Sequence, residues 1–366
     1  MAVPFFDLTA QTASIRQELE AAVAEVYAVG RLILGPKVEE LEKLWAGRCG
    51  ASYAVGVGSG TDALFLVLKA LGIGPGDEVI VPVLTAPPTA MAVKMTGATP
   101  VFADVEPVHL LLDPADLGRR MTTRSKAVIP VHLYGCPVNM DRILEAAKGL
   151  PVIEDSAQAH GTLWRGKQVG GFGIAGAFSF YPTKNLGAFG DAGMIVTADQ
   201  SLYRKLKRLR DYGRSDTHTV LEWGVNSRLD ELQAAILLVK LRHLGEWNKR
   251  RRENASLYRE HLSGVAVGCP LDPEGGLHTY HQYVIRAPRR EDLIRFLSAR
   301  SIQTAIHYPR LLCDQPAFKS EGSYPNARRA VQEILSLPVF PELRREDIIE
   351  VARAIAEFYG NQSADS

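Results

Sequence analysis

Short apolar runs alternate with helical patterns in the first half of this chain, and this alternation limits the folds open to it. Strand-like runs occur at residues 53–57, 78–82, 99–103 and 127–131. Segments with helical spacing of apolar residues occur between and after them, at 63–71, 89–95 and 140–148. Strands that alternate with helices are typical of a mainly parallel sheet with helices on both faces. The sequence therefore predicts an α/β fold.

A pair of carboxylates follows the next strand-like run. The apolar residues 151–153 lead directly into Glu154 and Asp155. Ligands bind beyond the carboxyl ends of strands in open α/β sheets, so Asp155 is placed at a ligand site. A carboxylate there can keep a pyridine nitrogen protonated, as pyridoxal phosphate requires. It can equally cap a helix, and Asp155 alone does not separate the two interpretations.

Lys184 favours a ligand site over a helix cap as the role of Asp155. An alternating run at 177–181 predicts a strand that stops at Pro182, and Lys184 follows on a turn. Apolar neighbours such as Phe180 and Leu186 would desolvate the amine, lower its pKa and favour a Schiff base. A single lysine is more often a solvated surface residue. Lys184 together with Asp155 predicts a pyridoxal phosphate site.

Two further motifs precede helices. Residues 58–62, Gly-Ser-Gly-Thr-Asp, form a turn whose glycines and free helix-start N–H groups can bind a phosphate, although such turns are also common without one. Asn226 and Arg228 precede the next long amphipathic segment, and a cap is the simplest role for Asn226. Farther along, strands are expected at 280–285 and 302–306, around a helix at 290–300.

The segments DSAQAHG (155–161) and SFYPTKN (179–185) resemble the cofactor segments of the DegT/StrS family of pyridoxal-phosphate-dependent sugar aminotransferases. The resemblance extends from residues 6–8 to the C-terminal helix. It implies the aspartate-aminotransferase-like fold, fold type I of the pyridoxal-phosphate-dependent transferases. That fold has a large domain with a mainly parallel, seven-stranded type of sheet and a small α+β domain. We expect the arm and large domain in 1–246 and the small domain in 247–366.

The resemblance also implies roles for individual residues. Lys184 would bind pyridoxal phosphate as a Schiff base and then act as general base, and Asp155 would pair with the pyridine nitrogen. Other cofactor contacts are expected from Gly60, Thr61, Gln158, Ser179 and Asn226. Because Asn226 would reach the cofactor of the neighbouring subunit, the resemblance implies a homodimer with shared active sites. Substrate contacts are expected from Thr85, His160, Tyr181, Arg228, His307 and Tyr308.

The implied reaction transfers an amino group from an amino acid, with L-glutamate expected, to a keto sugar, most plausibly a nucleotide-linked keto-deoxyhexose. A keto-inositol acceptor stays open, because the motifs describe the cofactor and not the acceptor. A sugar dehydratase of this family would replace Lys184 by histidine. Many relatives carry an aromatic residue, which stacks on the pyridine ring, where this chain has Ala86. The small side chain of Ala86 indicates an altered substrate pocket.

Composition excludes several classes of function. Lys and Arg number 42 against 41 Asp and Glu, so nothing favours nucleic acid or an anionic membrane. This balance, with no helix-turn-helix pattern, also disfavours a regulator that binds DNA. The 4 cysteines are scattered, and we expect reduced thiols in a cytoplasmic protein without a metal site. We find neither a signal-peptide pattern nor a long apolar run. Gly170–Gly173 lacks the spacing of a dinucleotide fingerprint.

Overall fold

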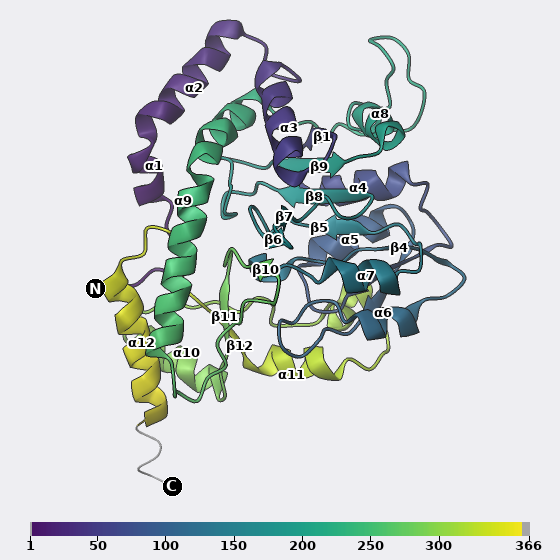
Figure 1. Cartoon of the computed structure of the whole chain (residues 1–366). Helices are drawn as coiled ribbons and strands as arrows, with labels where there is room; N and C mark the ends of the chain where they lie inside the picture. The colour runs from purple at the N-terminus through teal and green to yellow at the C-terminus, as the bar shows by residue number, and fades with distance from the viewer. Residues whose placement is uncertain (1, 361–366) are drawn as a thin grey trace.

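The computed structural model describes residues 2–360, and a twisted sheet lies at its centre between layers of helices (Figure 1). Its strands are β1 (Tyr53–Val57), β2 (Glu78–Pro82), β3 (Thr99–Ala103), β4 (Ser125–Val128), β5 (Ile153–Asp155), β8 (Ala175–Ser179) and β9 (Gly193–Thr197). They form one group in the order β1-β9-β8-β5 and another in the order β3-β2-β4. Parallel bridges Val128↔Val152 and Val131↔Asp155 join the two groups. The predicted α/β fold is confirmed.

Strand direction follows the prediction of a mainly parallel sheet. β9 is antiparallel to both β1 and β8, whereas β5 and β8, β2 and β3, and β2 and β4 are parallel pairs. Every residue of β2, β5 and β9 is buried. Strands that are covered on both faces are buried along their whole length, which explains why buried and exposed residues do not alternate in these segments.

Helices surround the sheet and begin and end at the residues that chain chemistry favours. Those before residue 210 are α1 (Thr9–Ser14), α2 (Arg16–Val29), α3 (Pro36–Cys49), α4 (Gly60–Ala70), α5 (Pro87–Met95), α6 (Pro114–Arg120), α7 (Met140–Ala146) and α8 (Gln200–Leu209). Pro36 starts α3, where its missing N–H costs nothing, and Gly50 ends it at φ 62°. The Asp199 carboxylate caps α8 by accepting from Leu202 N at 2.8 Å.

A single helix, α9 (Glu231–His261), connects the sheet region to the C-terminal elements. Beyond it lie β11 (Tyr283–Arg286), α10 (Arg290–Ala299), α11 (Pro325–Glu333), β12 (Ile334–Leu337) and α12 (Arg345–Gly360). The domain boundary expected between 246 and 247 falls inside α9, and the division stays a prediction. Among residues 2–360, none of the helices has the length and apolar character of a membrane span.

The expected strand at 302–306 is wrong. Ile302 forms only an isolated bridge with Val3, and Ala305 only one with Ser336. The antiparallel partner of β11 is instead β12, with Tyr283 opposite Leu337. The sequence favoured the nearer apolar run, whereas the segment with four consecutive buried positions lies more than thirty residues farther along the chain.

Small additional elements accompany the sheet. They comprise the short strands β6 (Leu163–Trp164), β7 (Lys167–Gln168) and β10 (Gly276–Leu277), and the 3₁₀ turns η1 (Leu133–Gly135), η2 (Leu312–Asp314) and η3 (Pro316–Phe318). β10 pairs with β6, so a segment that follows α9 returns to the large sheet region.

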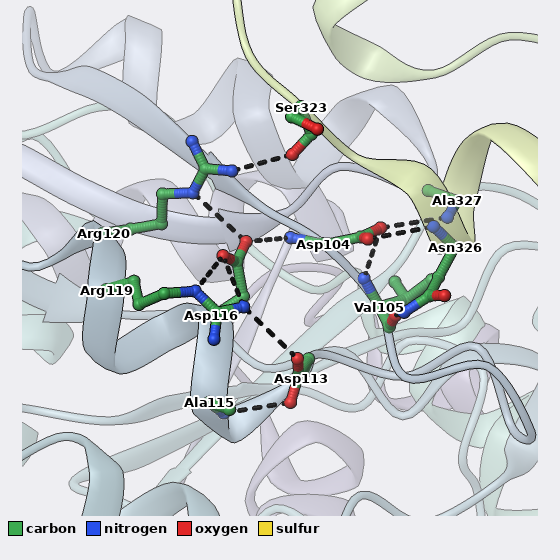
Figure 2. Close-up of polar contacts among 10 residues, drawn as sticks. All are labelled: Asp104, Val105, Asp113, Ala115, Asp116, Arg119, Arg120, Ser323, Asn326 and Ala327. Carbon is green, nitrogen blue, oxygen red and sulfur yellow. Dashed lines mark hydrogen bonds and ion pairs between the residues drawn. The ribbon is translucent and has the colours of Figure 1, made fainter.

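The start of α11 is fixed to the sheet region by buried carboxylates (Figure 2). Asp104 accepts from Asn326 N at 3.0 Å and from Ala327 N at 2.9 Å, which caps α11 from a residue far away in the sequence. Asp116 accepts from Asp104 N at 2.7 Å and from Arg120 Nε at 3.1 Å. Through these contacts the chain after Tyr308 returns to the large core.

Candidate active site

A cavity of about 220 Å³ opens where β5, β8 and the N-terminus of α4 meet. Eight of the residues expected at the site line it: Gly60, Thr61, Thr85, Asp155, Gln158, Ser179, Tyr181 and Lys184. The other five, His160, Asn226, Arg228, His307 and Tyr308, do not border this cavity in the single chain. The topology thus brings together the cofactor residues expected from one subunit.

Glu154 and Asp155 have different tasks because successive strand residues face opposite sides of a sheet. Asp155 faces the cavity, where its carboxylate accepts from Thr89 Oγ1 at 2.8 Å and from Ala157 N at 3.2 Å. Burial raises the pKa of Asp155, while the Thr89 hydroxyl opposes that rise. A cation placed beside Asp155, such as a pyridinium nitrogen, would favour its ionised form.

Glu154 faces the other way and stabilises a turn. Its carboxylate accepts from the backbone amides of Gly170, Phe172 and Gly173 at 2.6–2.8 Å and lies 3.1 Å from the His132 ring. Burial raises the pKa of Glu154, but His132 and these amides outweigh it and keep the pKa below its ordinary value. The glycine-rich segment 170–173 therefore binds a carboxylate of its own chain.

The turn that carries Lys184 is held by one face of α9. Gln233 Oε1 accepts from Phe189 N at 2.8 Å, and Lys240 Nζ donates to Gly187 O at 2.6 Å. The Asn248 side chain accepts from Asn185 Nδ2 at 2.9 Å. These three α9 residues are seven and eight positions apart, about two helical turns, so they share a face. The turn is thereby fixed before any ligand binds.

Lys184 has the electrostatic environment that a nucleophilic amine needs. Its half-buried side chain lines the cavity, and burial lowers its pKa to about 8 while Asp155 opposes that shift. A lower pKa makes a larger fraction of the amine neutral at physiological pH and so available for a Schiff base. The pKa of Lys184 is thus shifted in the direction that the expected desolvation predicts.

The start of α4 is built for a phosphate. Ser59 caps the helix by accepting from Asp62 N at 3.1 Å, so the first helical N–H groups, at Gly60 and Thr61, face the cavity end. A Cβ at Gly60 would lie 2.7 Å from the Ser179 Cβ. Thr85 Oγ1 is buried at the cavity without a hydrogen-bond partner among the described residues. The residues therefore fit a ring that carries a phosphate and further polar groups.

We predict that Gly60→Ala weakens phosphate-cofactor binding, because the new methyl group must displace Ser179 or the helix start. Overpacking of this kind costs about 1–3 kcal/mol, or roughly 5- to 150-fold in affinity. Titration of the apoenzyme with pyridoxal phosphate measures the effect. Gly47→Ala, in α3 with nothing within 4 Å of its added Cβ, is the matched control. Equal affinity for both variants would contradict the assignment of this turn.

Gln158 links the cavity to the segment that contains His307 and Tyr308. Its Oε1 accepts from Tyr134 N at 2.6 Å, and its Nε2 donates to Tyr308 Oη at 2.9 Å. The Tyr134 hydroxyl donates to His307 O. The expected contact of Gln158 with a cofactor oxygen stays a prediction, and Tyr308 is brought to the cavity edge by Gln158 although the two are far apart in sequence.

His160 is fully buried, and its environment differs from that of a substrate contact. Its ring packs against Trp45, Phe178 and Phe180 at centroid distances of 5.5–5.8 Å. Burial, assisted by the charge of Lys184, lowers the pKa of His160 to about 3, so the ring is neutral. His160 supports the strand that leads to Lys184, and its expected substrate contact stays a prediction.

Asn226 and Arg228 lie outside the cavity of their own chain. Asn226 is exposed, and its backbone forms an isolated antiparallel β-bridge with Asp211. Arg228 Nη1 donates to Asp211 Oδ1 at 2.9 Å. Arg228 also lies over the Tyr212 ring, 5.7 Å from its centroid. The expected contacts of Asn226 and Arg228 with cofactor and substrate stay predictions.

Two features of the cavity wall could not be predicted from the sequence. Ala86 stands where many relatives carry an aromatic residue, and it forms this part of the wall together with Pro88, Leu64 and Val131. The contact of Thr89 with Asp155 was missed, because its position after two prolines carries no chemical motif and only the fold brings it to β5.

Residues 13–356 match the DegT/DnrJ/EryC1/StrS aminotransferase family. The chain is 44% identical over 366 residues to a protein of Streptomyces venezuelae named dTDP-3-amino-3,4,6-trideoxy-alpha-D-glucose transaminase, covering 97% of this chain and 96% of that protein. It is 46% identical to UDP-N-acetyl-3-dehydro-alpha-D-glucosamine 3-aminotransferase of Acidithiobacillus ferrooxidans, covering 97% of each chain.

A solved structure of a similar protein has the same fold. The crystal structure of S. venezuelae DesV in complex with a ketimine intermediate superposes with a TM-score of 0.95 at 44% identity, covering 98% of each chain. Fold type I, expected from the cofactor segments, is thus confirmed.

Proposed function

Since the chain belongs to the DegT/DnrJ/EryC1/StrS aminotransferase family and so uses pyridoxal phosphate, we propose that it transfers an amino group from an amino acid to a nucleotide-linked keto sugar. We expect L-glutamate to be the amino donor. The observation that carries the proposal is Lys184, half-buried at the cavity with a pKa of about 8 and within electrostatic reach of Asp155. Surface lysines are not desolvated in this way.

The residues of the cavity divide the work of holding the cofactor. The N–H groups of Gly60 and Thr61, with the Ser179 hydroxyl, would bind the phosphate, and Asp155 would pair with the ring nitrogen. When bound, pyridoxal phosphate supplies an electron sink for the bonding electrons of the substrate carbon. Gln158, held by Tyr134 and Tyr308, fixes the edge of the ring.

Lys184 performs the proton transfer. Its amine would hold the cofactor at rest and would take a proton from the substrate carbon as general base. Desolvation keeps part of the Lys184 population neutral for this step, and Asp155 keeps the opposite charge nearby. The turn held by α9 keeps the amine aligned through both half-reactions.

The acceptor belongs beside Thr85, Tyr181, His307 and Tyr308, with Arg228 contributed by a neighbouring subunit. The small wall at Ala86 leaves room over the cofactor ring. Both curated relatives are named for an amino group at carbon 3 of a nucleotide-linked sugar, so a 3-keto sugar nucleotide is the first acceptor to test. A guanidinium suits the diphosphate of such a substrate.

We further propose a homodimer with shared sites, in which Asn226 contacts the phosphate of the partner's cofactor. The loop before Asn226 exposes Trp223 at 88%, and Val220 and Leu221 at 62% each. Exposed apolar residues that adjoin polar site residues are typical of an interface. We expect the enzyme to act in the cytoplasm, since its four free cysteines suit a reducing compartment.

The test supplies purified holoenzyme with L-glutamate and follows the cofactor's absorbance. We expect conversion to the shorter-wavelength amine form, and its reversal by a nucleotide-linked 3-keto sugar. Reversal by a keto-inositol alone would favour the aminocyclitol alternative. An absorbance that no amino acid changes would sink the proposed function, and a dehydratase is already disfavoured by Lys184.

A further inference from the structure

A second cavity, of about 130 Å³, borders the turn that carries Lys184. Thr183 lines this cavity, whereas Lys184 lines the cofactor cavity, so neighbouring residues of one turn face the two spaces. The remaining wall comes from the N-terminal Phe5, from α9 through Arg251, and from the C-terminal region through His281 and His307. No residue expected from the cofactor motifs other than His307 belongs to this cavity.

Arg251 is a buried cation without a described acidic partner at ion-pair distance. It is 4% exposed, and its Nη1 reaches the carbonyls of Tyr280 at 3.2 Å and His281 at 3.5 Å. Its Nε has no hydrogen-bond partner among residues 2–360. Glu342 attracts Arg251 electrostatically from beyond contact distance; its Oε1 accepts from Gln11, and its Oε2 is buried without a hydrogen-bond partner among residues 2–360. A guanidinium taken out of water is costly unless an anion compensates it.

Two neutral imidazoles share the cavity with Arg251. His281 uses Nδ1 toward Asn185 Oδ1 at 3.2 Å, and His307 uses Nδ1 toward Ser336 Oγ at 2.8 Å. The Nε2 atom of neither ring has a hydrogen bond to the described part of the chain. Burial, assisted by the charge of Lys184, lowers the pKa of both rings.

We infer that this cavity binds a carboxylate group of the amino donor, with Arg251 as the compensating cation. The inference rests on the proposed function and names a substrate contact for it. One guanidinium matches one carboxylate in charge and geometry. A sugar nucleotide is too large for the space, and the phosphate of the cofactor has its own site at Gly60.

The size of the effect follows from losing a charge-assisted hydrogen bond. Arg251→Met should raise the glutamate concentration for half-maximal conversion of the cofactor by about 10- to 100-fold. Cofactor occupancy and the KM of the keto-sugar acceptor should stay within about twofold, because neither ligand uses Arg251. Arg251→Lys keeps the charge and should fall between Arg251→Met and the wild type.

Arg252→Met is the matched control. Arg252 is the next residue of α9, but it points to the His278 carbonyl at 3.0 Å and does not line the cavity. Its replacement should leave the donor dependence unchanged. Equal losses for donor and acceptor in Arg251→Met, or equal donor effects in both variants, would show a merely structural role and overturn the inference.

A binding measurement makes the test independent of turnover and of the stability of Arg251→Met. Glutarate carries the carboxylates of glutamate without its amine, and calorimetry of the wild-type holoenzyme should show glutarate binding that competes with glutamate and weakens in Arg251→Lys. Absence of glutarate binding to the wild type would overturn the subsite while leaving the proposed function intact. Failure of the proposed function is recognised separately, since no amino acid would then change the absorbance of the wild type.

Discussion

Replacing Lys184 by alanine is expected to abolish transamination, with a loss of at least about 10²- to 10⁴-fold from proton transfer alone. The variant also loses the covalent link to pyridoxal phosphate, since no other lysine lines the cofactor cavity in the described chain. Stopped-flow measurement of the cofactor's absorbance after glutamate addition gives the rate. A small external amine can enter the space left by the side chain, and we expect it to restore part of the proton transfer.

Lys240→Met provides the matched control for this experiment. Lys240 is also a buried lysine whose pKa burial lowers to about 8, and it bonds the same turn through Gly187 O. It does not line the cofactor cavity, so we expect the cofactor to stay attached and the rate to fall by less than about tenfold, by loosening of the turn. Turnover retained by Lys184→Ala but lost by Lys240→Met would reverse the assignment.

The second large effect is expected for Asp155→Asn. The amide keeps the size of the side chain and can still bond Thr89 and the Ala157 N–H, so the local structure should persist. It removes the negative charge that pairs with the ring nitrogen. Loss of one member of a buried charge pair costs about 2–5 kcal/mol, equivalent to roughly 30- to 4,000-fold in the rate of donor conversion.

Two readouts separate this effect from loss of the site. Cofactor occupancy of Asp155→Asn should stay close to that of the wild type, because we propose that the phosphate binds at the start of α4 and not at Asp155. Only the rate of the absorbance change after glutamate should fall. A variant that converts the cofactor as fast as the wild type would show that Asp155 does not serve the ring nitrogen.

Local chemistry explains why much of the site could be predicted from the sequence. The phosphate turn, the carboxylate after β5 and the lysine after β8 each combine a strand end with a neighbouring turn or helix start. These patterns need only a few consecutive residues, so they are visible without knowledge of the fold. Apolar periodicity likewise revealed the helices expected at 63–71, 89–95, 140–148 and 290–300, and the family resemblance supplied the fold type and the expected role of each motif.

Contacts between distant segments could not be predicted in this way. The expected strand at 302–306 failed because its apolar residues pair only through isolated bridges, while β12 supplied the partner of β11. Thr89 lines the cavity and bonds Asp155, but it carries no motif of its own. The bond between Gln158 and Tyr308 likewise joins segments that are far apart in the sequence. The sequence also does not show that Arg251 is buried. Spacing in a charged helix indicates the face on which a residue lies, but not which segments cover that face.

The sequence by itself determined the chemistry of this protein: a lysine, a carboxylate and a phosphate turn, each at the end of a predictable element. Only the tertiary structure decided the electrostatic environment of those groups and which residues contact them. Burial shifts the pKa of Lys184 and of Asp155, and one face of α9 aligns the catalytic turn. The physical reason is that desolvation and hydrogen-bond geometry depend on every segment packed around a group, whereas a motif depends only on its neighbours along the chain.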